Sequence, residues 1–167
     1  TSAVPLESVE VAVIGSGYTG LHAAIVTARA GCSTQVIDKH MPGWGCSTRN
    51  GGQISPSIKP TLATMTRKYG ASQAMAIRNE GYKSLDWIDN FINREKIDCN
   101  YKKCGRFQAA HTPAHFDALV RDAQKLGEEE GVEFKIVSRD DQRRELGTDS
   151  YFGGVIFTND ASVDPAN

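Results

Sequence analysis

The sequence has 167 residues, of which 40% are hydrophobic and 23% charged, a composition typical of a soluble globular chain long enough to form a core. Its net charge of −1, with both signs interspersed, argues against nucleic acid or an acidic membrane as a partner. No stretch approaches the roughly 18 apolar residues of a membrane span, and the start lacks a signal-peptide pattern, so we expect a cytoplasmic protein.

The first part of the chain predicts a compact βαβ unit. Residues 9–14, VEVAVI, are a short apolar and β-branched run, which is typical of a buried parallel strand. After a turn at 15–20, the Ala-rich residues 21–30 predict a helix that ends at Gly31. The stretch TQVID at 34–38 predicts the second strand.

A long loop and a long helical region are expected next. Residues 41–60 are rich in Gly, Pro and Ser, and a loop of this length is uncommon in a compact domain unless it is functional. Apolar residues at helical spacing then predict helix over 72–95. Gly70 and Gly81 are the expected breaks in this region.

The last part of the chain predicts strands around one well-capped helix. Thr112 is suited to an N-cap and Pro113 to the first helical position, and the helix they open is expected to continue to about residue 130 and to end at Gly131. The other stretches have strand-like or short helical patterns: strands at 101–110, 132–138 and 151–158, and a charged helix at 139–147.

The turn between the first strand and the first helix reads GSGYTG, from Gly15 to Gly20. This spacing alone is a weak signal, and its alternative is a Gly-rich turn of an ordinary α/β protein. Here it follows a strand, opens a helix and precedes an acid at the next strand's end, which is the context of a dinucleotide fingerprint. Gly15 allows the tight turn, Gly17 the approach of a pyrophosphate, and Gly20 close helix–strand packing. The helix N-terminus can bind phosphates, and Asp38 can accept hydrogen bonds from a ribose.

The loop after the second strand favours FAD over NAD. An NAD-binding domain usually continues from this strand into another crossover helix, whereas this chain enters PGWGCSTRNGGQIS at 42–55. Flavin is flat and largely apolar and carries an anionic linker, so its close approach needs the bare backbone that four glycines supply here. The pattern predicts FAD as the cofactor, with an NAD-dependent dehydrogenase as the alternative.

On these residues the chain resembles the D-amino-acid-oxidase-like family of FAD-dependent oxidoreductases, which includes glycine and sarcosine oxidases. The likeness is to the gamma-glutamylputrescine oxidase branch, whose loop reads much like G-x-G-x-S-x-R-N-G-G-Q, matched here from Gly43 to Gln53. It continues more weakly through YFGGVIFTNDASVDPA at 151–166. It covers only the N-terminal portion of the family's fold.

The resemblance implies which residues bind the cofactor. In the family this loop passes the pyrophosphate and ribityl chain and reaches the isoalloxazine ring, which implies phosphate binding by Ser47 and a position near the ring or substrate for Arg49 and Gln53. Arg49 is also the implied catalytic residue. The implied cofactor-binding residues are Gly15, Gly17, Tyr18, Thr19, Gly20, Asp38, Lys39, Gly45, Cys46, Ser47, Arg49, Asn50, Gly51, Gly52 and Gln53.

Several side chains in these motifs keep a second interpretation. Arg49 alternatively forms a structural ion pair, Trp44 alternatively only packs, and Cys46 is either a small spacer or a reactive thiol. The side chains of Ser16 and Tyr18, at variable positions of the fingerprint, are expected to point away from the site.

No metal site or disulfide is expected. The cysteines at 32, 46, 99 and 104 match no zinc pattern and no CxxC motif, so they are interpreted as reduced thiols. His111 and His115 are four residues apart, but Pro113 places His111 before the helix begins and no partner ligand follows.

The expected fold class is α/β: a Rossmann-like, doubly wound FAD-binding core with the start of a mixed, mainly antiparallel substrate domain. Residues 1–100 are expected to be the N-terminal part of the FAD-binding domain, and 101–167 the beginning of the substrate domain. The remainder of both domains is expected to lie outside this chain.

The expected function is oxidation of the C–N bond of an amine or amino acid, with a hydride equivalent passing to flavin N5 and the resulting imine then hydrolysed. The expected partners are a small-molecule amine substrate, oxygen or another electron acceptor, and the rest of the polypeptide or a second chain. The alternative is a non-catalytic or split-enzyme nucleotide-binding subunit.

Overall fold

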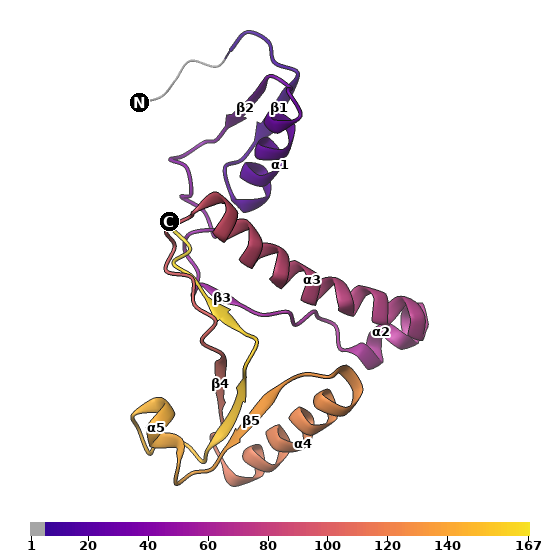
Figure 1. Ribbon diagram of the computed structural model, residues 1–167, viewed down its shortest axis with the longest axis vertical. Coiled ribbons are helices and arrows are strands. Elements are labelled where there is room, and N and C mark those ends of the chain that lie inside the picture. Colours follow the sequence, from indigo (N-terminus) through magenta and orange to yellow (C-terminus); the bar gives the residue numbers. More distant parts are fainter. Residues whose placement is uncertain (1–5) are drawn as a thin grey trace. The chain divides into compact units, whose positions relative to one another are not determined.

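The computed structural model describes residues 6–167, which divide into two compact units. Among these residues, the first unit holds 6–52 and 164–167, and the second holds 53–163. Figure 1 follows the chain through both units, and each is described by itself below. The domain boundary expected near residue 100 stays a prediction.

The first unit is built on the predicted βαβ arrangement. β1 (Val11–Ile14) and β2 (Thr34–Ile37) pair in parallel along their whole length, and α1 (Tyr18–Arg29) connects them. The helix begins inside the expected turn, because Gly17 has the extended backbone of an N-cap, with φ of −73° and ψ of 176°. As a result, the first turn of α1 lies within the glycine-rich motif.

The sheets of the second unit are antiparallel. β4 (Arg106–Ala109), β6 (Gly154–Phe157) and β5 (Phe134–Val137) form a three-stranded sheet in the order β4-β6-β5. β3 (Gln53–Ile54) and β7 (Ala161–Ser162) form a separate antiparallel pair. Together with the parallel pair of the first unit, these sheets make the described chain an α/β structure with mainly antiparallel pairing in its second unit.

The sequence predicts helix breaks at both Gly70 and Gly81, and only the first occurs. Gly70, with φ of +81°, ends α2 (Leu62–Tyr69), and α3 (Ala71–Glu95) then runs through Gly81 without interruption. A Cβ at position 81 would collide with the carbonyl oxygen of Pro56. Glycine is needed there because the loop between β3 and α2, which contains Pro56, packs on the backbone of α3. The expected break at Gly81 is therefore wrong.

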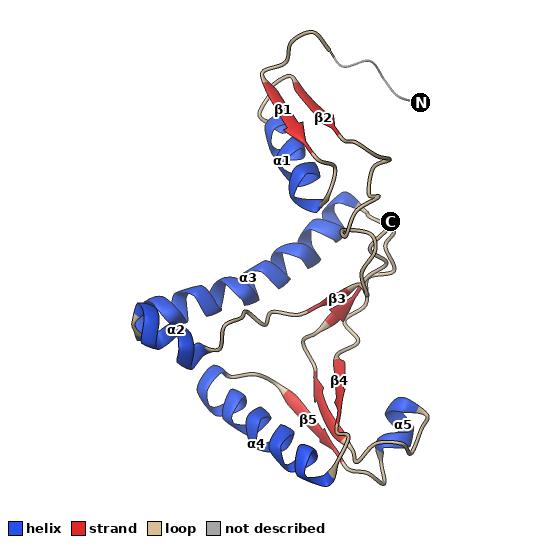
Figure 2. Cartoon of the chain, turned by 180° about the vertical axis from the view of Figure 1, so that it is seen from behind, coloured by secondary structure: helices blue, strands red, loops and turns tan. Residues whose placement is uncertain are grey.

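α4 (Pro113–Glu130) begins and ends where the sequence predicts. The Thr112 hydroxyl accepts a hydrogen bond from the amide of His115 at 3.1 Å, and Gly131 follows as the helix ends. α4 lies beside β5 in both views (Figures 1 and 2) and packs against the three-stranded sheet. In the chain, a short helix, α5 (Gln142–Leu146), follows β5 and precedes β6.

The second unit has a hydrophobic core. Ala110, Leu119, Ala123 and Val155 are buried together, and aromatic and aliphatic side chains from α4 and the sheet pack around them. In contrast, α1, β1 and β2 contain no buried residue within the described part of the chain.

Candidate nucleotide-binding site

The glycine-rich turn has the geometry that the fingerprint requires. Gly15 follows β1 with φ of +103°, a conformation that side chains disfavour, and its amide donates to the carbonyl oxygen of Ile37 at 2.8 Å. A Cβ at Gly20 would collide with the carbonyl oxygen of Gly15 and lie 3.3 Å from Cγ1 of Val13. The two glycines therefore let α1 start directly against the end of β1.

Ser16 connects this turn to the end of β2. Its side chain is buried, and both its amide and its hydroxyl donate to Oδ2 of Asp38, each at 2.6 Å. The amide of His40 donates to Oδ1 of the same carboxylate at 2.9 Å. The expectation that Ser16 points away from the site is therefore wrong, because its short hydroxyl is the donor that fixes the acid. No local signal in the sequence indicated this contact, because its two residues are 22 positions apart.

These hydrogen bonds set the charge of Asp38. The side-chain hydrogen bond from Ser16, followed by the backbone hydrogen bonds from His40 and Ser16, lowers the pKa of Asp38 from 3.8 to about 2. At this pKa the carboxylate is ionised at neutral pH. Because the residue is exposed, the carboxylate can accept further hydrogen bonds on its solvent side. This is the chemistry that a ribose hydroxyl needs.

Ser47 brings the loop after β2 to the N-terminus of α1. Its hydroxyl oxygen accepts a hydrogen bond from the amide of Tyr18 at 3.1 Å, and a Cβ at Gly17 would lie 2.9 Å from that oxygen. Leu21 donates the first intrahelical bond, to the carbonyl oxygen of Gly17 at 2.9 Å. The amides of the residues before Leu21 therefore lie at the open end of the helix, where an oxyanion can bind.

The loop itself is held by its own side chains. Asn50 donates to the carbonyl oxygens of Cys46 and Ser47 at 3.0 and 2.9 Å, and its Oδ1 accepts from the amide of Gly52 at 2.8 Å. The hydroxyl of Thr48 donates to the carbonyl oxygen of Gly43. Asn50, which the resemblance implies as a cofactor contact, is thus also the residue that closes the loop.

Arg49 lies on an aromatic stack rather than in an ion pair among the described residues. Its guanidinium carbon is 4.1 Å from the centroid of the Trp44 ring, and the ring of His40 stacks on Trp44 with centroids 4.2 Å apart. Trp44 is 53% exposed, so the stack lies at the surface of the first unit. The guanidinium is held there by a cation–π contact.

The remaining candidate residues make few contacts with the turn and the loop described above. Lys39, Cys46 and Thr19 are exposed, and within the described chain a Cβ at Gly45 or Gly51 would meet no atom within 4 Å. The hydroxyl of Tyr18 donates to the carbonyl oxygen of Pro165 at 2.8 Å. Every candidate residue lies in the first unit except Gln53, which begins β3 in the second.

Other site types have no counterpart in the described residues. Residues 6–167 contain no cluster of three or more His, Cys, Asp or Glu side chains that could hold a metal ion. Their four cysteines are all unpaired. None of their helices combines the length and the apolar character that crossing a membrane requires.

The site described above defines a dinucleotide-binding α/β protein, because a glycine turn joins a parallel strand to a helix N-terminus and an ionised acid ends the next strand. The sequence model of the DAO family, described as FAD dependent oxidoreductase, matches residues 10–167. The chain therefore belongs to this family, whose cofactor is FAD.

Curated relatives match nearly all of this chain but only part of their own length. The chain is 28% identical to the gamma-glutamylputrescine oxidoreductase of Escherichia coli (strain K12) over 160 residues, which are 95% of this chain and 37% of that protein. It is also 28% identical to the probable oxidoreductase OrdL of Haemophilus influenzae, over 97% of this chain and 38% of that protein. The chain thus spans less than two fifths of the length of these relatives.

Solved structures share the fold. Glycine oxidase from Geobacillus kaustophilus superposes with a TM-score of 0.68 at 18% identity, over 95% of this chain and 41% of that one. L-Amino acid deaminase from Proteus myxofaciens gives a TM-score of 0.70 at 19% identity, over 99% of this chain and 35% of that one. These likenesses confirm the predicted fold class, α/β with a Rossmann-like core and a mixed, mainly antiparallel part.

Proposed function

We propose that the full-length protein is a flavin-dependent oxidase or dehydrogenase that oxidises the C–N bond of an amine or amino acid. Membership of the FAD-dependent DAO family supports this. The similar proteins support the substrate class, because they are named for gamma-glutamylputrescine, glycine and L-amino acids. Oxygen or another acceptor would complete the reaction.

We also propose that residues 1–100 belong to the FAD-binding domain and residues 101–167 to the substrate domain. A cytoplasmic location is proposed from the cysteine pattern.

The observation that carries the proposal is the contact between Ser47 and the N-terminus of α1, at 3.1 Å. It brings the loop with the family's glycine pattern to the end of the helix where a pyrophosphate would bind. In this arrangement the amides of Thr19 and Gly20, with the Ser47 hydroxyl, would hold the phosphates. Asp38 would hold the ribose through its ionised carboxylate.

The other candidate residues would act along the loop. Gly17, Gly45, Gly51 and Gly52 would leave space for the cofactor, with the backbone of Tyr18, Lys39, Cys46 and Asn50 and the side chain of Gln53 beside it. When bound, FAD supplies the acceptor for the hydride equivalent that leaves the substrate carbon next to nitrogen. Arg49, held on Trp44, would stabilise negative charge at the reacting end and orient a substrate carboxylate.

The test is spectroscopic and uses the full-length protein. It should purify with FAD or take it up, show flavin absorbance in the visible range, and lose that absorbance under anaerobic conditions when a suitable amine from a panel of amines and amino acids is added. A colourless protein that takes up no FAD would contradict the proposal. Flavin that binds but is reduced by no amine would contradict the substrate class, and purification only with a second, larger chain would favour the split-enzyme alternative.

A further inference from the structure

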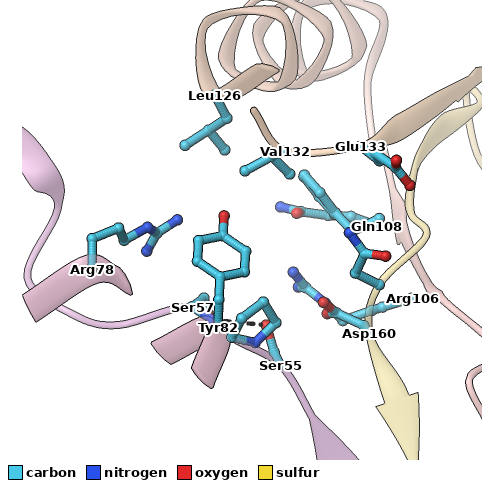
Figure 3. A pocket seen from close by; sticks show the side chains of 13 residues that line it. Ser55, Ser57, Arg78, Tyr82, Arg106, Gln108, Leu126, Val132, Glu133 and Asp160 are labelled. Atoms are coloured by element: carbon cyan, nitrogen blue, oxygen red, sulfur yellow. Dashed lines mark hydrogen bonds and ion pairs between the residues drawn. The ribbon is translucent and has the colours of Figure 1, made fainter. Parts of the chain in front are cut away.

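The second unit contains a cavity of about 160 Å³ that lies outside the nucleotide-binding site. Its walls come from the loop after β3, from α3, from β4, from the connection between α4 and β5, and from the end of β6. Most of its polar lining consists of hydrogen-bond donors: Ser55, Ser57, Arg78, Tyr82, Arg106 and Gln108 (Figure 3).

Two arginines in this wall are each held by one buried acid. Nε of Arg78 forms an ion pair with Glu130, and the two side chains are only 10% and 3% exposed. Nε of Arg106 donates to Oδ2 of Asp160 at 2.6 Å, and the Asp160 side chain is 6% exposed. Because both contacts use the Nε edge, each guanidinium retains terminal amino groups, with their own N–H donors. The acids fix the arginines in place and leave those donors for another acceptor.

Tyr82 supplies a further donor that the described chain does not satisfy. Its hydroxyl is buried and has no hydrogen-bond partner among residues 6–167. Figure 3 shows this hydroxyl directed away from α3 toward Leu126 and Val132, with the amide of Gln108 close to the same space. A buried hydroxyl without an acceptor is unfavourable, because it has lost its hydrogen bonds to water and gained none.

We propose that this cavity binds one carboxylate group, which accepts hydrogen bonds from the Tyr82 hydroxyl and from the terminal amino groups of Arg78 and Arg106. A carboxylate suits the donors because guanidinium groups match its planar pair of oxygens. Glu133 also lines the cavity, so the two arginines face three acids with Glu130 and Asp160. A group with one negative charge would meet less repulsion from these acids than a phosphate. The carboxylate comes either from a small molecule or from an Asp or Glu side chain elsewhere in the full-length polypeptide.

The test compares the full-length protein with two tyrosine variants by thermal unfolding, in sodium acetate and in sodium chloride of the same ionic strength. Tyr82→Phe removes only the unsatisfied hydroxyl. Tyr101→Phe is the matched control, because the Tyr101 hydroxyl is also buried without a partner in residues 6–167 but does not line the cavity. A carboxylate from solution should raise the Tm of the wild type and of Tyr101→Phe by ~2 °C in acetate relative to chloride. In Tyr82→Phe this shift should be lost.

A carboxylate from the polypeptide gives a different pattern and also supports the proposal. In that case acetate has no effect, and Tyr82→Phe lowers the Tm in chloride because an existing hydrogen bond is removed. Two results would overturn the proposal: an acetate shift that Tyr82→Phe retains, or no acetate effect together with an unchanged Tm in Tyr82→Phe. A crystal of the full-length protein soaked in acetate gives an independent reading through electron density beside Tyr82.

Discussion

Asp38 is an exposed acid whose position is nevertheless fixed. Ser16 and His40 supply three hydrogen bonds to its two oxygens, and these keep the carboxylate ionised at the end of β2. Fixing the acid before a ligand arrives reduces the ordering that binding would otherwise require. The proposed ribose contact therefore depends on Ser16 as well as on Asp38.

Asp38→Asn should change how stability depends on pH. The folded pKa of Asp38, about 2, lies below its usual 3.8, so the stabilisation is fully present above the usual value and is lost as pH falls through about 2. The Tm difference between wild type and Asp38→Asn should be constant from neutral pH to about pH 5 and should shrink below about pH 4. Asp117→Asn, at an exposed position of α4, is the control. A difference that stays constant to the lowest measurable pH would show that the hydrogen bonds do not hold the charge.

Arg49→Ala should slow flavin reduction by the substrate while leaving FAD bound. The reason is that the guanidinium is the charge proposed to stabilise the reacting end, and loss of one such electrostatic contact costs on the order of 10²-fold in rate. The measurement is anaerobic stopped-flow reduction of the full-length protein, with FAD content determined in parallel. A rate unchanged within error would leave Arg49 with only a structural contact to Trp44.

Trp44 tests whether the stack positions Arg49. Trp44→Leu removes the ring face under the guanidinium, whereas Trp44→Phe retains an aromatic face, and Trp is the strongest of the aromatic partners of a cation. We expect Trp44→Leu to lower the reduction rate part of the way toward that of Arg49→Ala, and Trp44→Phe to lower it less. In an Arg49→Ala background both substitutions should have little further effect. Equal losses with and without Arg49 would mean that Trp44 acts independently of it.

At the scale of elements, the sequence correctly predicted the features that are set by residues close together in the chain. The cap at Thr112, the end of α4 at Gly131 and the βαβ order follow from local chemistry, and the structure has each of them. The break at Gly81 failed because the Pro56 carbonyl that requires glycine there lies 25 positions earlier, and composition cannot show that contact. The contact between Ser16 and Asp38 was missed for the same reason, since 22 residues separate its partners.

Gly20→Ala and Gly81→Ala separate close packing from cofactor binding. Helix propensity alone would make either change stabilising by about 1 kcal/mol, but each new Cβ would collide with a carbonyl oxygen, of Gly15 or of Pro56. Both variants should therefore lower the Tm of the full-length protein. Only Gly20→Ala should also weaken FAD binding, measured by flavin fluorescence titration, because only that collision displaces the turn at the N-terminus of α1. Equal FAD affinity in the two variants would contradict the proposed site.

Gln142 fixes the segment between α5 and β6. Its side chain is fully buried, donates to the carbonyl oxygen of Tyr151 at 2.8 Å and accepts from the amide of Gly153 at 3.3 Å. Gln142→Leu would leave both backbone groups without this partner, so we expect a loss of about 1–3 kcal/mol in the free energy of unfolding. Gln124→Leu, at an exposed position of α4, should change it by less than about 0.5 kcal/mol. Chemical denaturation measures the free energy of unfolding of both variants. Equal losses would show that the Gln142 side chain does not stabilise the segment between α5 and β6.

At the scale of the whole molecule, the two units differ in how much core the described chain gives them. The second has the cluster around Leu119 and Val155. The first has a two-stranded parallel sheet, and its apolar side chains include Ile14 at 80% exposure, Val26 at 54% and Leu21 at 41%. A two-stranded sheet without a buried face is marginal in water, so its stability must come from further packing.

Expressed alone, residues 1–167 should therefore be ordered unevenly. In hydrogen exchange, the amides of α4 and β6 should be protected, whereas those of α1, β1 and β2 should exchange nearly as fast as in an unfolded chain. In the full-length protein the same three elements should be protected, because the part of the fold that this chain does not span, more than three fifths of the length of the curated relatives, can cover their apolar side chains. FAD should stay with the full-length protein through gel filtration and be lost from the 167-residue chain. If that chain retained FAD and protected α1 as well as α4, the nucleotide-binding unit would be stable without further packing, and the exposed faces of α1 and β1 would need another explanation.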